Sequence, residues 1–232
     1  MNKPSFTSIV VVNYMGKGLV NLMGSLGRNF GYDNSYKDLD SLPNLDKSSV
    51  ILIILDGMGY DLVMNYSKGF LKEKTIDKMY TVFPTTTVAA VTSLMSGEAP
   101  LQHGITGWWM CMSEFSTPKE IIRINEESLP KNVKANQIFP KSFFSKINID
   151  SYMVIDSNLI DTLYNKCNSE KSIPLTYKPG NLDDFINKIN GAIKKPNPKY
   201  ACAYWPGIDH LSHEKGKHHP DTLNHFYKLS NV

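Results

Sequence analysis

The sequence predicts an α/β protein with a mostly parallel central sheet, and two kinds of observation lead to this fold class. Residues 50–55 form an unbroken run of Val, Ile and Leu that ends at an Asp-Gly pair, which is typical of a strand buried on both faces. Weaker apolar runs occur at residues 152–155 and 200–205. Segments with helical character alternate with these runs, and such alternation indicates a parallel sheet flanked by helices.

Besides the strands, the sequence predicts several helices and an N-terminal extension. The expected helices are residues 87–96, 158–165, 182–194 and one that begins near Pro220. In front of the first strand, residues 18–26 favour a small amphipathic helix, and the polar residues 32–47 favour a loop. We therefore expect an N-terminal extension, residues 1–48, that packs on a main domain of residues 49–232.

Composition excludes several classes of protein. Lys and Arg number 25 against 22 Asp and Glu, so the net charge is +3 and nothing indicates a nucleic-acid-binding face. The three cysteines, Cys111, Cys167 and Cys202, are too few and too scattered for a disulfide framework or a CxxC metal site. The apolar run at residues 9–12 is too short for a membrane span or a signal peptide. We expect a cytoplasmic protein without a membrane segment, and its oligomeric state stays open.

Asp56 follows the strongest predicted strand directly. In a parallel sheet the binding crevice lies beyond the carboxyl ends of the strands, so residues at this place are candidates for function. An Asp-Gly pair is also a common turn, and that reading is favoured for the pair alone. As a ligand, the carboxylate of Asp56 would suit a divalent cation.

The second motif is a Thr-rich string that opens the helix expected at residues 87–96. Thr85, Thr86 and Thr87 follow Pro84, and the helix leads into Ser-Gly-x-x-Pro-x-x-His-Gly at residues 96–104. A Thr here can cap the helix. The same geometry favours a phosphate group at the helix N-terminus, where a Thr hydroxyl beside a metal can become a nucleophile. Capping needs one hydroxyl only and does not require the string that follows.

The third motif follows the run at residues 200–205. Asp209 and His213 are four residues apart, so on a helical turn they lie on one face and can hold one ion. A carboxylate with an imidazole suits zinc. A lone Asp-x-x-x-His is more often an ordinary surface pair.

Together and in this order, the three motifs resemble those of nucleotide pyrophosphatases/phosphodiesterases of the alkaline phosphatase superfamily. The resemblance spans about residues 50 to 216, and its middle string is the most specific part. It implies an alkaline phosphatase-like fold for residues 49–232 and a metal-dependent hydrolase of phosphodiester or pyrophosphate bonds. The expected substrate is a small phosphate ester or a nucleotide, and the expected cofactors are two divalent metal ions, of which Zn²⁺ fits best.

The resemblance also implies a role for each matching residue. Asp56 would bind one zinc ion, and Thr87 would be the nucleophile that touches the same ion and forms a covalent intermediate. Asp209 and His213 would bind the second zinc ion. His103 matches the family as well, but we interpret it as structural.

The sequence departs from the family pattern at two places. Ala90 stands where the family has a phosphate-binding Asn, which implies a different substrate preference. After His213 the family's later Asp-His pair and final His are missing; the remaining candidates are His218, His219, Asp221 and His225. The expectation is therefore a member that is incomplete at the C-terminus, with two protein ligands for each ion where zinc normally takes three or four.

Three hypotheses follow from these residues. The first is a phosphodiesterase or pyrophosphatase, the second a catalytically inactive remnant of that family, and the third a phosphomonoesterase or phosphonate hydrolase of the same superfamily. The residues that recognise the substrate cannot be named. We expect Trp108, Trp109 and Tyr204 to fill the core rather than stack on a nucleotide base.

Overall fold

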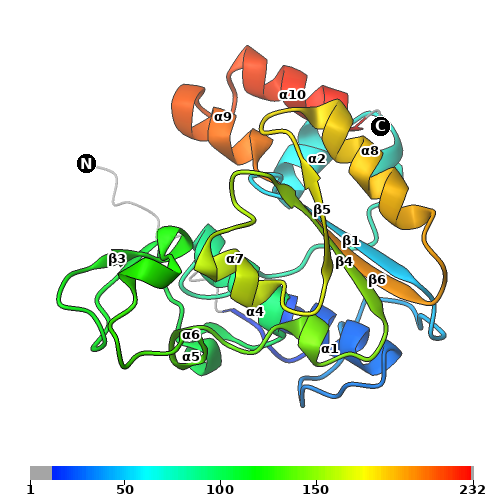
Figure 1. Ribbon diagram of the computed structural model, residues 1–232. Coiled ribbons are helices and arrows are strands. Elements are labelled where there is room, and N and C mark those ends of the chain that lie inside the picture. Colours follow the sequence, from blue (N-terminus) through cyan, green and yellow to red (C-terminus); the bar gives the residue numbers. More distant parts are fainter. Residues whose placement is uncertain (1–11, 231–232) are drawn as a thin grey trace, which may run out of the picture.

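A four-stranded parallel sheet forms the centre of the molecule, for which a computed structural model describes residues 12–230. The strand order is β1-β6-β4-β5, and every pairing is parallel (Figure 1). This arrangement confirms the predicted fold class. The strands of this sheet are β1 (Val50–Leu55), β4 (Asp150–Asp156), β5 (Ile173–Tyr177) and β6 (Lys199–Trp205).

Helices surround the sheet, and a small antiparallel pair, β2 (Trp109–Met110) and β3 (Lys119–Glu120), lies apart from it (Figure 1). The helices are α1 (Leu19–Asn29), α2 (Tyr60–Tyr66), α3 (Phe70–Glu73), α4 (Thr87–Ser96), α5 (Pro100–His103), α6 (Ala135–Ile138), α7 (Leu163–Asn168), α8 (Leu182–Ile193), α9 (Gly207–Lys215) and α10 (Pro220–Ser230). The helices expected at 87–96, at 182–194 and from Pro220 are confirmed.

The helix expected at residues 158–165 is placed wrongly. Turns occupy most of that range, and α7 begins at Leu163. The hydroxyl of Thr162 accepts a hydrogen bond from the backbone amide of Asn165, so Thr162 is the N-cap. The helix therefore begins after its cap Thr162, whereas the apolar pattern predicted a start at residue 158.

Alternate residues of the strands face two separate cores. On β6, Cys202 faces the side covered by α1 and α4, whereas Ala203 and Trp205 face the side covered by α8. Since α10 also contributes Leu229 to the second core, helices cover both faces of the sheet. The period of two along each strand thus produces a three-layer α/β/α arrangement.

The first strand differs from its prediction. The run of residues 50–55 is not buried on both faces: β1 pairs with β6 alone and lies at the edge of the sheet. The side chain of Ile53 is 45% exposed. An apolar run shows that a segment prefers burial, but it does not show how many neighbours the strand has.

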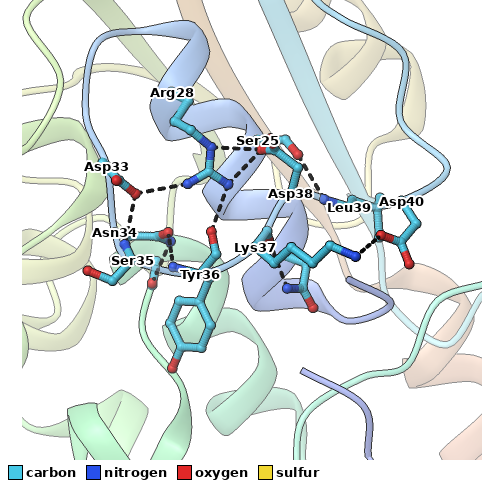
Figure 2. A network of polar contacts seen from close by, with 12 residues as sticks. Ser25, Arg28, Asp33, Asn34, Ser35, Tyr36, Lys37, Asp38, Leu39 and Asp40 are labelled. Atoms are coloured by element: carbon cyan, nitrogen blue, oxygen red, sulfur yellow. Dashed lines mark hydrogen bonds and ion pairs between the residues drawn. The ribbon is translucent and has the colours of Figure 1, made fainter. Parts of the chain in front are cut away.

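The segment between α1 and β1 is tied down by polar contacts (Figure 2). The guanidinium of Arg28, on α1, donates to the carboxylates of Asp33 and Asp38 and to the backbone carbonyl of Tyr36. Ser25, one turn earlier, accepts a hydrogen bond from the backbone amide of Leu39. These contacts hold the loop expected at residues 32–47 against α1, and the division of the chain at residue 48 stays a prediction.

No helix within residues 12–230 combines the length and the apolar character needed to cross a bilayer. The apolar run at residues 9–12, considered above as a candidate membrane or signal segment, lies outside the described residues except for Val12.

Candidate functional site

A groove of about 700 Å³ opens beyond the carboxyl ends of β1 and β6. It contains all four residues that the sequence predicts for the site, although they come from three separate parts of the chain. Such a crevice is where parallel α/β sheets generally bind ligands. The residues that line the groove are Asp56, Thr85, Thr86, Thr87, Trp108, Tyr204, Pro206, Asp209, His210 and His213.

Asp56 and Asp209 are brought together by the backbone. The amide of Asp56 donates to the carbonyl of Trp205, and the amide of Asp209 donates to the carbonyl of Asp56, at 2.9 and 3.2 Å. Gly57 makes this approach possible: its φ is +77°, and a Cβ there would lie 2.6 Å from the backbone nitrogen of Asp209. The Asp-Gly pair is therefore a turn, and it is also the place where α9 meets the end of β1.

The three threonines at the start of α4 have different environments. Thr86 is the N-cap, and its hydroxyl accepts a hydrogen bond from the backbone amide of Ala89 at 3.3 Å. The hydroxyl of Thr85 donates to the carbonyl of Val82. The hydroxyl of Thr87 bonds to no residue in the described range 12–230. Capping therefore accounts for Thr86 and does not involve the hydroxyl of Thr87.

Asp209 and His213 lie on one face of α9, with the Oδ2 atom of Asp209 3.6 Å from Nε2 of His213. Burial raises the pKa of Asp209, and the nearby carboxylate of Asp56 raises it further. His213 and His210 act in the opposite direction but do not offset these two effects. No Lys or Arg among residues 12–230 lines the groove, so within this range the two carboxylates have no fixed counter-charge beside them.

Tyr204 holds Asp56 in place, a role that the sequence did not reveal. Its hydroxyl donates to Oδ2 of Asp56 at 2.7 Å, and burial beside this carboxylate raises the pKa of the phenol. The contact depends on the register of β1 and β6, which places Ile54 opposite Tyr204. Without knowing that these two strands are neighbours, nothing in the sequence links residues 56 and 204.

The expectation that Trp108 and Trp109 fill the core is wrong. Their side chains are 40% and 62% exposed, and Trp108 lines the groove. The indole nitrogen of Trp108 donates to Glu120 on β3 at 2.9 Å, which holds the ring at the groove wall. The hairpin has a core beside it, to which Met110 and Ile121 contribute, but the two indoles are not part of that cluster.

His103 lies outside the groove, in the position of a structural residue. Its Nδ1 accepts a hydrogen bond from the backbone amide of Ile105, so Nε2 carries the proton and donates to Ser93, both at 3.0 Å. Burial lowers the pKa of His103 to about 4. The imidazole is therefore neutral at pH 7 and joins α4 to α5.

The histidines after His213 do not line the groove. His218 bonds to the hydroxyl of Tyr66, and Nε2 of His225 accepts a hydrogen bond from the indole of Trp205. His219 lies beside Asp221 at the start of α10. Within residues 12–230 there is also no group of three His, Cys, Asp or Glu side chains that could hold a metal ion.

The residues of the groove fit a divalent cation by type and fall short by number. Carboxylate and hydroxyl oxygens with one imidazole are donors that zinc accepts, and two carboxylates with no Lys or Arg beside them within residues 12–230 favour a cation electrostatically. A structural zinc site, however, takes four ligands and a catalytic one takes three from the protein. The groove supplies Asp56 and Thr87 on one side and Asp209 and His213 on the other.

The fold and the groove together define a class of protein: a parallel α/β protein with a crevice between its strand ends and a helix N-terminus, an arrangement that suits a phosphate-bearing ligand. The model of one family, type I phosphodiesterase / nucleotide pyrophosphatase, matches residues 50–231, and the chain belongs to this family. The resemblance inferred from the three motifs is thereby confirmed, and with it the alkaline phosphatase-like fold. No curated protein matches the chain.

The family indicates a general activity. Its members are hydrolases that act on phosphodiester and pyrophosphate bonds of small phosphate-ester substrates, generally with divalent metal ions. The roles of single residues in this chain are a separate question.

Proposed function

We propose that the chain hydrolyses phosphodiester or pyrophosphate bonds with two zinc ions and with Thr87 as the nucleophile. The observation that carries this proposal is the free hydroxyl of Thr87 in the same groove as Asp56, Asp209 and His213. The capping role at the start of α4 belongs to Thr86, so the hydroxyl of Thr87 is not needed to satisfy the helix N-terminus.

The substrate phosphate would lie at the N-terminus of α4. The backbone amides of Thr87 and Val88, in the first turn, have no acceptor among residues 12–230, and the helix dipole favours negative charge at this end. Both effects favour a position for phosphorus beside the hydroxyl of Thr87. They would also stabilise the charge that develops on the phosphate oxygens in the transition state.

The reaction would proceed in two displacements at phosphorus. The Oγ1 atom of Thr87 attacks, the bond to the leaving oxygen breaks, and the phosphoryl or nucleotidyl group stays on Thr87. Water then attacks the same phosphorus and releases the threonine, which gives net retention. Asp56 with Thr87, and Asp209 with His213, would hold the two ions, whose charge lowers the pKa of a bound hydroxyl and stabilises the leaving oxygen.

Hydrolysis of bis(p-nitrophenyl) phosphate in the presence of zinc tests the proposal. Replacing Thr87 with Ala removes the nucleophile, and we expect the rate to fall at least about 10³-fold. Thr86→Ala is the matched control: it removes a cap, which costs about 1 kcal/mol of stability, and leaves the nucleophile in place. Equal rates for the wild type and Thr87→Ala, or inversion with a chiral thiophosphate diester, would reject the threonine step.

A second candidate is a family member that no longer catalyses. The lack of a group of three ligands within residues 12–230 favours it. Zinc titration separates the two: two tightly bound ions per chain support the enzyme, whereas none supports the inactive protein. Comparing p-nitrophenyl phosphate with the diester distinguishes a phosphomonoesterase from a phosphodiesterase.

A further inference from the structure

Asp56 differs from Asp209, the other carboxylate of the groove, in how its oxygens are occupied. Its Oδ2 atom accepts the hydrogen bond from the hydroxyl of Tyr204 at 2.7 Å, and its Oδ1 atom accepts one from the backbone amide of Gly57 at 3.0 Å. Within residues 12–230 the carboxylate of Asp209 has only a 3.6 Å contact with Nε2 of His213. The orientation of the Asp56 carboxylate is therefore fixed more firmly than that of Asp209.

Tyr204 is itself held in place by β6 and its neighbours. Its backbone carbonyl accepts a hydrogen bond from the hydroxyl of Tyr177 at 2.9 Å, and its ring packs against the core that lies between the sheet and the helices α1 and α4. The next residue, Trp205, accepts the backbone amide of Asp56 at 2.9 Å. Consecutive residues of β6 thus hold Asp56 by its side chain and by its backbone.

The hydrogen bond from Tyr204 limits how Asp56 can bind a cation. An ion that both oxygens of a carboxylate chelate must lie close to Oδ2, where the hydroxyl hydrogen of Tyr204 already lies. Moving this hydrogen aside would leave a partly buried hydroxyl without a partner, because within residues 12–230 it bonds to Asp56 alone. Coordination through one oxygen avoids this cost.

Divalent cations differ in what they require from a carboxylate. Ca²⁺ takes about six to eight oxygen ligands and often binds both oxygens of a carboxylate. Zn²⁺ is satisfied with about four ligands, which can include carboxylate oxygens and imidazole nitrogens. A carboxylate that offers a single oxygen therefore favours the ion with the lower coordination number.

We propose that Tyr204 is a positioning residue that restricts Asp56 to coordination through one oxygen and thereby makes the groove select zinc over calcium. The inference rests on the proposed function, because it concerns the metal ions that the groove would hold. Tyr204 acts through Asp56 alone and touches no reacting atom. Hydrogen-bond partners of metal ligands have measurable effects of this kind, since their removal typically lowers metal affinity about 10- to 100-fold.

Calorimetric titration of the metal-free chain with zinc and, separately, with calcium tests the proposal without turnover. We expect the wild type to prefer zinc. In Tyr204→Phe the affinity for zinc should fall at least about tenfold and the affinity for calcium should not fall, because Oδ2 becomes available for chelation. The zinc-to-calcium ratio of affinities should therefore fall at least about tenfold.

Tyr200→Phe is the matched control. Tyr200 lies on the same strand, is buried in the core and does not line the groove, so the loss of its hydroxyl should leave the ratio unchanged. Both variants keep the aromatic ring, and thermal melts with a chelator verify that they are folded. A purely structural role of Tyr204 would lower both affinities by the same factor. That result, or a wild type that binds neither ion or prefers calcium, would overturn the proposal.

A double-mutant cycle shows whether the effect passes through Asp56. The amide of Asp56→Asn has one oxygen only, so in this background Tyr204→Phe cannot restore chelation and should leave the zinc-to-calcium ratio unchanged. An effect of Tyr204→Phe that persists undiminished without the carboxylate would contradict the assignment.

Hydrolysis assays separate this inference from the proposed function. A preference for zinc that depends on Tyr204, in a chain that hydrolyses neither the diester nor the monoester, would support the inference and reject the catalytic proposal. Hydrolysis that depends on Thr87, together with an unchanged ratio in Tyr204→Phe, would reject the inference alone.

Discussion

Two polar regions of this molecule differ in how their groups are satisfied. Around Arg28 each charge has a partner of opposite sign: hydrogen bonding to Asp38 raises the pKa of the guanidinium, and Arg28 in turn lowers the pKa of Asp38 (Figure 2). In the groove, the carboxylates of Asp56 and Asp209 have no Lys or Arg beside them within residues 12–230, and burial together with the charge of Asp56 raises the pKa of Asp209.

This difference helps to distinguish polar groups that stabilise the fold from polar groups that bind a ligand. Structural groups find protein partners, because an unpaired buried group is costly. Groups that serve a ligand can do without a protein partner, and this is the role proposed above for the hydroxyl of Thr87. Substitutions in and near the two regions test this distinction.

Gly57→Ala should have the largest effect. The new Cβ would lie within 3 Å of the backbone of Asp209, at a φ of +77° that Ala rarely adopts. We expect a loss of about 3 kcal/mol in the free energy of unfolding and a fall of about 10² in kcat/KM. Gly59→Ala is the control, because Gly59 has φ −75° and nothing within 4 Å of its Cβ position. Similar urea melts for the two variants would show that the close approach is unimportant.

His103 should make the fold sensitive to acid. Its pKa is about 4 in the fold against an ordinary value of 6.5, so the unfolded chain binds more protons between these values and stability falls as pH falls through them. From pH 7 to pH 5 we expect a loss of about 2 kcal/mol. Urea melts of the wild type and of His103→Gln check this. The variant should be much less sensitive, whereas His210→Gln, at an exposed position, should behave as the wild type does.

The Arg28–Asp38 pair should contribute a moderate amount. The pKa of Asp38 is lowered, so its stabilising effect is present above the ordinary value of 3.8 and is lost as pH falls through the folded value. Because both side chains are partly exposed, we expect a coupling energy of about 0.5–1 kcal/mol at pH 7 in a double-mutant cycle with Arg28→Met and Asp38→Asn. A coupling that persists undiminished at pH 2 would show that the charges are not its source.

Asp209→Asn should have the smallest effect on stability, and of the opposite sign. The raised pKa of Asp209 means that ionisation is disfavoured in the fold, so removing the charge should stabilise the free protein at pH 7. Partial exposure limits the gain to about 0.5 kcal/mol. In thermal melts with a chelator the variant should exceed the wild type, and added zinc should then stabilise the wild type only. A variant less stable than the wild type under both conditions would contradict the comparison.

Part of the fold and of the site can be predicted from the sequence. Local signals predict α4, α8 and α10, because a cap residue and a helical apolar pattern are properties of a short segment. The strand runs predict β4 and β6 for the same reason. β5 was missed, since the segment Ile173–Tyr177 is partly polar and its inner face is recognised only beside β4. The position of β1 at the edge was missed because the apolar content of a segment does not show how many strands lie beside it.

The candidate site, too, could be predicted from the sequence only in part. From the sequence alone, Asp56, Thr87, Asp209 and His213 could be named as candidates for the site, because each belongs to a motif of fixed spacing. The tertiary structure was needed to show that they share one groove, that Tyr204 holds Asp56 and that Trp108 lies at the groove wall. It was also needed to show that the side-chain amide of Asn168 has no hydrogen-bond partner within residues 12–230. These facts depend on strand order, register and close approach, and such relations join residues that are up to about 150 positions apart.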